Sequence, residues 1–279
     1  MISSKKYVDE TLKKYNLVAN KSLGQNFLVE SDIANYIVDS ANINSSSCVI
    51  EIGPGLGALT EFIVKKAGLV LAFEIDSNMV NILKQTFKEN ENLIINNIDF
   101  LKVDIGNLIN EINEKGYKDI IVLSNLPYYI TSKLLNKILV NNYNIHTIDT
   151  MMQKEVGQKI LKPEKKEYNA LSIILDYQYD VSIVKYVGKN SYLPRPEIDS
   201  IVLKFEKIAP KANVNFELLL QVSNCLFAAR RKTVYNNLKN IIKDNQKIIN
   251  VLEKCNISLE THIEQLSFND IINICNYLI

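Results

Sequence analysis

The chain has 279 residues, of which 47% are hydrophobic and 23% are charged, and its formal net charge is +1. These values are typical of a globular protein with one large domain, or a large and a small one, and they exclude disordered and collagen-like chains. The longest apolar run has five residues and no signal-peptide-like segment opens the sequence, which excludes a membrane-spanning helix and predicts a cytoplasmic protein.

Beyond residue 44, short apolar runs alternate with segments of helical periodicity, as in a parallel sheet flanked by helices. Strands are predicted at residues 48–52, 69–75, 92–99, 119–125, 147–152, 180–187 and 200–207. Helices are predicted at residues 58–67, 78–89, 132–140 and 170–179, with one more between the third and fourth strands. The last two strands flank a proline-bearing loop and are predicted as an antiparallel pair. We therefore expect an α/β fold with a mixed seven-stranded sheet.

The C-terminal part of the chain has a different character. After residue 208 no strand-like run remains, and helical segments are predicted at residues 216–229, 232–242, 246–255 and 268–279. We therefore expect a large α/β domain at residues 1–207 and a small all-α domain at residues 208–279.

Positive charge is concentrated in two segments. Residues 225–247 have a local charge of +5 and residues 1–25 a local charge of +3. Arginine is scarce in this chain, yet Arg230 and Arg231 stand together before Lys232. Because phosphate neutralisation dominates nucleic-acid affinity, this triplet is a candidate contact with nucleic acid. A solvated helix face is the alternative for the other lysines of the segment.

The chain offers few ligands for a metal. Its four Cys residues lie at wide spacings without a C-x-x-C pair, and only two His residues could join them. We therefore expect buried free thiols and no metal site.

A glycine-rich loop follows the first predicted strand. Residues 51–57 read Glu-Ile-Gly-Pro-Gly-Leu-Gly, and such glycines let the backbone turn tightly and approach a ligand at the start of the next helix. Glu74 ends the second strand 21 residues after Gly53, where an acid binds a ribose diol in dinucleotide sites. The loop and the acid alone predict either NAD or another nucleoside cofactor.

Polar residues also end the next two strands. Asp99 ends the third, where its carboxylate can accept a hydrogen bond from the amine of an adenine, and Asn125 ends the fourth. Ligands of such sheets collect at the carboxyl ends of the strands. Together with Gly53 and Glu74, these residues predict one cofactor site with a polar contact from each of four strand ends.

Asn125 begins the sequence Asn-Leu-Pro-Tyr, which suits methyl transfer to an adenine amino group. The lone pair of that nitrogen is delocalised into the ring, so two acceptors aimed at its N–H groups would make it more nucleophilic. The side-chain oxygen of Asn125 and the carbonyl of Leu126 can be these two acceptors. Pro127 restricts the backbone at Leu126 and so holds that carbonyl outward. Tyr128 can stack on a base rotated out of its helix. The alternative is a turn that only ends the strand.

Several motifs occur together along the chain. They are residues 24–28 (GQNFL), 51–60 (EIGPGLGALT), 73–76 (FEID), 99–104 (DFLKVD), 125–131 (NLPYYIT), 151–160 (MMQKEVGQKI) and 192–200 (YLPRPEIDS). In these motifs the chain resembles the ribosomal RNA adenine N6-dimethyltransferases, and among them the small-subunit dimethyladenosine transferases (KsgA/RsmA type). The resemblance runs from residue 21 to residue 207, and more weakly to residue 240.

The resemblance implies S-adenosylmethionine as the methyl donor, bound without a metal in a class I methyltransferase (Rossmann-like) fold. The cofactor-binding residues that it implies are Gln25, Asn26, Leu28, Gly53, Gly55, Glu74, Ile75, Asp99, Phe100 and Asn125. The implied catalytic residues are Asn125, Leu126, Pro127 and Tyr128. The implied substrate-binding residues are Tyr128, Tyr192, Arg230, Arg231 and Lys232, with Tyr192 covering the target base opposite Tyr128. Ile98 stands where the family usually has Gly.

The activity implied by the resemblance is N6-dimethylation of two adjacent adenosines in a 3'-terminal hairpin loop of small-subunit (16S) rRNA. The implied enzyme is a cytoplasmic monomer that acts on the immature small ribosomal subunit and contacts no membrane. One alternative is a large-subunit rRNA adenine N6-methyltransferase of the erythromycin-resistance type. A non-catalytic assembly or transcription factor on the same fold is another. An NAD-dependent oxidoreductase is a third, but it leaves the Asn-Leu-Pro-Tyr sequence unexplained.

Overall fold

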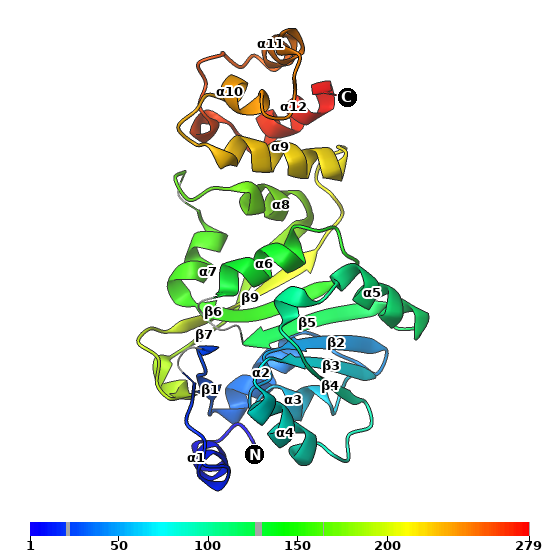
Figure 1. Ribbon diagram of the computed structural model, residues 1–279, viewed down its shortest axis with the longest axis vertical. Coiled ribbons are helices and arrows are strands. Elements are labelled where there is room, and N and C mark those ends of the chain that lie inside the picture. The colour runs from blue at the N-terminus through cyan, green and yellow to red at the C-terminus, as the bar shows by residue number, and fades with distance from the viewer. Residues whose placement is uncertain (21–22, 126–129, 164, 279) are drawn as a thin grey trace. The chain divides into compact units, whose positions relative to one another are not determined.

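The structure, a computed structural model, describes residues 1–20, 23–125, 130–163 and 165–278. The described strands are β1 Phe27–Leu28, β2 Ser47–Ile52, β3 Leu69–Glu74, β4 Leu93–Asn97, β5 Asp119–Asn125, β6 Thr147–Gln153, β7 Tyr179–Val187, β8 Tyr192–Leu193 and β9 Ser200–Lys207. Seven of them form one sheet in the order β4-β3-β2-β5-β6-β9-β7, and β1 pairs separately with β8 (Figure 1). The mixed seven-stranded sheet that the sequence predicts is therefore present.

Helices connect the strands of this sheet and follow its last strand. They are α1 Lys5–Lys14, α2 Ser31–Ser40, α3 Thr60–Ile63, α4 Ser77–Thr86, α5 Ile105–Glu114, α6 Thr131–Leu139, α7 Lys154–Leu161, α8 Ala170–Gln178, α9 Phe216–Ala228, α10 Val234–Leu238, α11 Asn245–Lys254 and α12 Phe268–Leu278, with 3-10 turns η2 Phe100–Lys102, η4 Lys189–Ser191 and η5 Ile263–Gln265. Capping side chains set several helix starts. Asp76 and Asp104, for example, accept backbone hydrogen bonds at the first turns of α4 and α5.

The centre of the sheet is parallel. β2 pairs in parallel with β3 and β5, and the parallel ladder continues to β4 on one side and β6 on the other. β9 runs antiparallel to β6. β2 and β3 are buried along their whole length, as expected of parallel strands covered on both faces. The carboxyl ends of β2, β3, β4 and β5 therefore meet at one edge of the sheet.

The helix predicted at residues 58–67 is much shorter in the structure. α3 covers only Thr60–Ile63, with turns before and after it. Gly57 has a φ of +93°, and a Cβ there would lie 2.6 Å from the Phe87 ring. The glycine loop thus follows a path that L side chains rarely adopt, and it leads into a single helical turn rather than into a long helix.

The sequence pattern did not indicate α1, α2, α7 or the pair of β1 with β8. In this pair, Phe27 lies opposite Leu193 and Leu28 opposite Tyr192. A two-residue strand has no periodicity to detect, and its partner is remote in the sequence. The pair ties residues 24–28 to the loop that follows β7.

The described chain divides into two compact units. The first comprises Met1–Gln158 and Val181–Lys207, and the second comprises Lys159–Asp180 and Ile208–Ile279. The predicted boundary after β9 is present, but the predicted assignment of residues 159–180 to the α/β domain differs from this division.

Aromatic packing explains why residues 159–180 belong to the second unit. The ring centroids of Tyr177 and Phe216 lie 6.0 Å apart, and those of Tyr168 and Phe227 lie 6.2 Å apart. Both contacts join the α8 region to α9. The helical pattern of α8 resembles that of any crossover helix, so its packing partner could not be read from the sequence.

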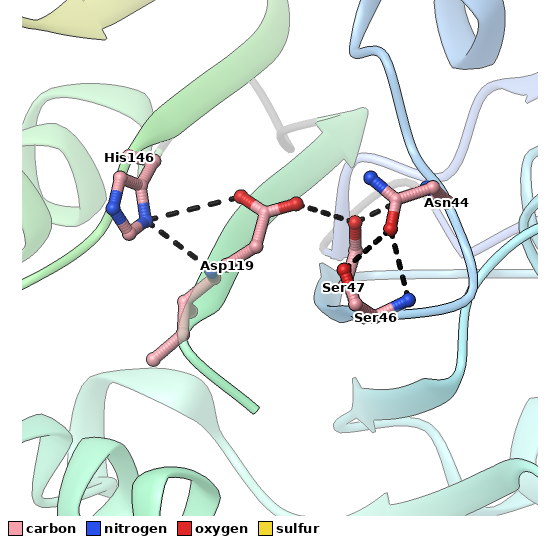
Figure 2. Close-up of polar contacts among 6 residues, drawn as sticks. Asn44, Ser46, Ser47, Asp119 and His146 are labelled. Atoms are coloured by element: carbon pink, nitrogen blue, oxygen red, sulfur yellow. Dashed lines mark hydrogen bonds and ion pairs between the residues drawn. The ribbon is translucent and has the colours of Figure 1, made fainter. Parts of the chain in front are cut away.

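A polar cluster joins the strands at the sheet edge where β2 and β5 begin (Figure 2). Ser47 donates its hydroxyl hydrogen to Asp119 and accepts the Asn44 N–H at 3.1 Å. His146 Nδ1 lies 3.8 Å from the other oxygen of the Asp119 carboxylate and accepts the Ile120 N–H at 3.4 Å. The carboxylate stands between the hydroxyl and the imidazole, whereas a catalytic triad needs the His to contact the Ser. The cluster therefore connects strand starts and supplies no activated nucleophile.

Asp149 is a buried acid on β6. One oxygen of its carboxylate accepts a hydrogen bond from Ser40 Oγ at 3.1 Å, and the other has no partner among the described residues. Burial raises the pKa of Asp149 to about 6, although the Lys204 ammonium, opposite it in the β6–β9 ladder, acts to lower the pKa. The ionised form is therefore disfavoured in the folded protein.

We expect Asp149→Asn to remove a pH dependence of stability. The raised pKa of about 6 stabilises the fold below the unfolded pKa of ~3.9, and this contribution is lost as the pH rises through 6. The difference between the two pKa values corresponds to roughly 3 kcal/mol. Urea unfolding between pH 4 and pH 8 is the test. As the pH rises over this range, the free energy of unfolding of the wild type should fall relative to that of the variant. Parallel plots of the two free energies against pH would contradict the expectation.

Candidate active site

A cavity of about 190 Å³ opens in the first unit, at the carboxyl ends of the central strands. All ten of the predicted cofactor-binding residues line it: Gln25, Asn26, Leu28, Gly53, Gly55, Glu74, Ile75, Asp99, Phe100 and Asn125. The structure thus brings together residues that are spread over 100 positions of the sequence (125 − 25). The parallel arrangement of β2 to β5 is the reason, because it gathers their carboxyl ends.

The glycine loop forms one wall of the cavity. Gly53 and Gly55 have φ values of +68° and +59°, a conformation that glycine adopts without steric cost. The Gly53 N–H donates to the Phe73 carbonyl at 2.9 Å, and a Cβ on Gly53 would lie 3.9 Å from the Asn125 carbonyl oxygen. The loop backbone therefore runs close to the end of β5, and its main chain faces the cavity.

Glu74 is held rigidly at the cavity wall. Its Oε2 accepts the Gly55 N–H at 3.1 Å and its Oε1 accepts the Asp76 N–H at 2.9 Å. Only 6% of the residue is exposed, and this burial raises its pKa while the backbone hydrogen bonds lower it. Both oxygens keep lone pairs that can accept hydrogen bonds from the hydroxyl groups of a ligand.

A second acid, Glu51, lines the cavity and was not among the predicted site residues. It is 1% exposed and accepts the Thr60 hydroxyl hydrogen at 2.7 Å. Its pKa is raised to about 8, mainly by burial and in part by the nearby Glu74, against the Thr60 hydrogen bond, which lowers it. Its carboxyl is therefore mostly protonated at pH 7. A charged residue inside a buried apolar strand is the sequence signal that could have indicated this position.

Asp99 and Phe100 stand at the end of β4. Asp99 Oδ1 accepts the Leu101 N–H at 2.9 Å and so caps η2. The Phe100 ring packs edge-on against Phe73, with centroids 5.2 Å apart and an interplanar angle of 72°. A polar acceptor and a fixed aromatic side chain thus adjoin each other at this wall of the cavity.

Two exposed apolar side chains, Ile75 and Ile98, line the same region. Ile98 donates its N–H to the Glu74 carbonyl at 3.1 Å. Its φ is not positive, so the backbone before Asp99 does not require a glycine at this position. The side chain of Ile98 instead adds apolar surface beside Asp99.

The N-terminal segment closes the cavity from another side. Gln25 Nε2 donates to Asp76 Oδ2 at 2.8 Å, and Asn125 Nδ2 donates to the Asn26 carbonyl at 3.4 Å. Leu28 is 2% exposed and sits in β1. With its nitrogen bonded to the backbone, the Asn125 amide keeps its oxygen as an acceptor.

The apolar lining from this segment was not predicted. Ile2, Val8, Leu23 and Phe27 all line the cavity, and the Phe27 ring lies 3.4 Å from where a Cβ on Gly55 would stand. The apolar spacing along α1 could have indicated that this helix buries one face.

The structure does not describe the rest of the Asn-Leu-Pro-Tyr sequence. Leu126, Pro127 and Tyr128, which were predicted as catalytic residues, lie outside the described residues. Asn125 ends β5 at the cavity, and Ile130 and Leu134 line the cavity beyond the gap.

The position of Tyr192 does not fit its predicted role. The residue is 3% exposed, belongs to an apolar core cluster and donates its hydroxyl hydrogen to the Met151 sulfur at 2.8 Å. Tyr192 is also absent from the cavity walls. The pairing of β8 with β1 turns this ring inward, so no ring face is open to a base in this structure.

The basic triplet lies in the second unit, in the turn after α9 and not on a helix. Arg231 and Lys232 are exposed, whereas Arg230 is half-buried. Arg230 Nη2 donates to the Lys165 carbonyl at 3.2 Å. The three residues therefore have different surroundings, although the sequence presents them as equivalent.

Comparison with known proteins identifies the family. The model of the family described as ribosomal RNA adenine dimethylase matches residues 16–279. The chain belongs to this family. It is 40% identical over 276 residues to the ribosomal RNA small subunit methyltransferase A of Bacillus pumilus, covering 96% of this chain and 94% of the relative. It is 39% identical to the protein of the same name from Bacillus cereus, covering 97% and 94%.

Solved structures agree with the fold. A dimethyladenosine transferase from Plasmodium falciparum is similar with a TM-score of 0.70 and 25% identity, over 88% of this chain and 94% of that chain. The 23S rRNA methyltransferase ErmE is similar with a TM-score of 0.64 and 19% identity, over 91% and 99%, a likeness of fold alone. The predicted Rossmann-like fold and the predicted rRNA adenine dimethyltransferase family are therefore confirmed. The oxidoreductase alternative is excluded.

The described residues also bear on the expectations about membrane helices, metal ligands and cysteines. None of the helices there is long and apolar enough to cross a membrane. Within the same residues no group of three or more His, Cys, Asp or Glu side chains could hold a metal ion. All four cysteines are free, and Cys255 is half-buried while the other three are buried.

Proposed function

We propose that this protein transfers methyl groups from S-adenosylmethionine to the N6 atoms of two adjacent adenosines in a 3'-terminal hairpin loop of small-subunit rRNA. One observation carries the proposal: four strand ends, with Gly53, Glu74, Asp99 and Asn125, converge on one cavity in a member of the rRNA adenine dimethylase family. The names of the curated relatives support the small subunit as target. The proposed substrate is the immature subunit, and the proposed enzyme is a cytoplasmic monomer.

The residues of the cavity fit S-adenosylmethionine. When bound, this cofactor supplies an electrophilic methyl group on its sulfonium sulfur. Glu74 has the free lone pairs to bind a ribose diol, and the Asp99 carboxylate can accept a hydrogen bond from the adenine amine. Phe100, Ile75 and Ile98 offer apolar surface for an adenine ring. The cavity thus has residues that can bind the ribose, the adenine amine and the adenine ring of a nucleoside.

The chain acts on the target adenine by positioning its amino group. Asn125, through its side-chain oxygen, and Leu126, through its carbonyl, are the proposed acceptors for the two N–H groups, and Tyr128 is the proposed stacking partner of the base. Positioned acceptors of this kind stabilise the charge that develops on the nitrogen. No His is among the described residues that line the cavity, so we propose that the released proton passes to solvent.

Methyl incorporation is the test of this function. Purified protein with labelled S-adenosylmethionine should label immature small subunits isolated without the modification, and mapping should find the label on two adjacent adenosines. Large subunits should stay unlabelled. Label on the large subunit would favour the erythromycin-resistance alternative, and tight binding of small subunits without any transfer would favour a non-catalytic assembly factor.

A further inference from the structure

Arg230 joins two basic segments of the second unit. Its guanidinium donates hydrogen bonds to three backbone carbonyls of the loop between α7 and α8, those of Lys165, Lys166 and Tyr168. A guanidinium is a planar group with five donors and can bind several carbonyls at once. The turn after α9 is thereby tied to a loop that lies more than 60 residues earlier in the chain.

The Arg230 side chain is built into the unit. Its Cζ lies 5.7 Å from the centroid of the Phe227 ring, which also makes an edge contact with Tyr168. The Nε atom of Arg230 is buried. Because its other nitrogens bind carbonyls, this arginine has little capacity left to bind a phosphate. Its position instead determines where the loop lies.

Asn237, on α10, holds the turn from its other side. This fully buried side chain donates through Nδ2 to the Ala229 carbonyl at 3.2 Å and to the Lys232 carbonyl at 3.5 Å. The backbone of residues 229–232 is thus held both by α10 and by the α7–α8 loop. Arg231 and Lys232 remain exposed on this braced turn.

The α7–α8 loop adds further positive charge. Its acid Glu167 is paired with a lysine of α7 at 2.9 Å, so that negative charge is compensated, and Glu164 lies outside the described residues. Three lysines of the loop are exposed. The exposed cations of the two segments joined by Arg230 are Lys162, Lys165, Lys166, Arg231 and Lys232.

We propose that these five cations form one RNA-binding surface, the composite basic surface, and that Arg230 is a positioning residue that sets the spacing of its two segments. The inference rests on the proposed function, because it takes small-subunit rRNA as the partner. Cations on two braced segments match the spaced phosphates of an RNA backbone. The lysines of the α7–α8 loop thereby gain a role in substrate binding that their sequence context did not indicate.

Salt-dependent binding to a small-subunit rRNA transcript tests the surface. Each phosphate that a cation neutralises adds about 0.7–0.9 to the slope of log K against log salt. Lys162→Ala combined with Lys165→Ala should lower the slope by roughly 1.5, as should Arg231→Ala combined with Lys232→Ala. The matched control is Lys84→Ala with Lys88→Ala, two exposed lysines of the first unit. If the control pair lowers the slope as much as the loop pair does, the proposal of a composite basic surface is wrong.

Arg230→Lys tests the positioning role. The variant keeps the charge, but its one ammonium nitrogen replaces the two guanidinium nitrogens that bind the three carbonyls, so the spaced, planar set of donors is lost. We expect weaker binding in the otherwise wild-type chain, and little further loss in a chain that already lacks Lys162 and Lys165, because the loop no longer contributes there. Wild-type affinity would mean that Arg230 acts only through its charge. A loss of equal size in both chains would mean that it acts independently of the loop. Either result overturns the positioning role.

Methyl transfer separates this inference from the function on which it rests. Each variant is assayed on immature small subunits, and its S-adenosylmethionine affinity checks that the first unit is folded. If the wild type methylates small subunits while the loop variant keeps the wild-type salt slope, the composite basic surface is wrong and the proposed function stands. If the wild type methylates no small-subunit rRNA, the proposed function itself fails.

Discussion

Asn125→Ala should lower methyl transfer to immature small subunits by about 10²–10³, with little change in the affinity for rRNA. The Asn125 amide lies at the end of β5 in the cavity, and its nitrogen is bonded to the Asn26 carbonyl, which orients the oxygen. Removing the side chain deletes one of the two proposed acceptors of the adenine amino group. The loss of a single transition-state hydrogen bond typically costs a factor of this size.

Single-turnover kinetics with saturating cofactor and subunits is the measurement, because it reports the chemical step rather than binding. Asn136→Ala is the matched control, since Asn136 is an exposed residue of α6 whose Nδ2 donates to the Ser132 carbonyl one turn earlier. Near-normal transfer by the Asn125 variant would refute its role as an acceptor. It would also remove the main chemical reason for choosing an adenine amino group as the methyl acceptor.

Glu74→Ala should weaken S-adenosylmethionine binding by roughly 10- to 150-fold. A hydrogen bond to a charged group contributes about 1.5–3 kcal/mol, and tenfold in affinity corresponds to about 1.4 kcal/mol. The variant also loses the two bonds by which the carboxylate holds the Gly55 and Asp76 N–H groups. The cofactor would therefore meet a less ordered glycine loop as well as a missing acceptor.

Calorimetric titration of the cofactor checks this expectation. Glu74→Gln keeps the shape and one acceptor oxygen, so it should bind the cofactor more tightly than the Ala variant and more weakly than the wild type. Glu89→Ala, at an exposed acid that pairs with Lys88, controls for the change in net charge. Unchanged affinity in Glu74→Ala would take Glu74 out of the cofactor site and reopen the choice of ligand.

The strand-end residues show how much of the site could be predicted. Gly53, Glu74, Asp99 and Asn125 were assigned to one site because parallel strands must end at one edge of the sheet, and all four line one cavity in the structure. Their succession along the chain is a local property of apolar runs and the polar residues that end them. The sequence alone is therefore sufficient to place them together, without knowledge of any side-chain contact.

Residues whose role depends on remote partners could not be assigned in this way. Tyr192 stands in a motif that suggested base stacking, but its pairing with Leu28 turns it into the core. Arg230 is adjacent to Arg231 in the sequence, yet Arg230 is half-buried against the α7–α8 loop while Arg231 is exposed. The sequence gives the type of side chain at each position, but the segments that pack against the residue decide whether that side chain faces solvent.

By itself, the sequence determined the central strands and the residues at their carboxyl ends, because hydrophobic periodicity and glycine content act locally along the chain. The family followed from the resemblance of its motifs. Only the tertiary structure decided that Glu51 is a buried, mostly protonated acid in the cavity wall, and that residues 159–180 pack with the C-terminal helices. The physical reason is the same in both cases. Desolvation and packing depend on which distant segments bury a residue. These segments are brought together by closing long loops of chain, and such long-range contacts produce no periodic pattern in the sequence.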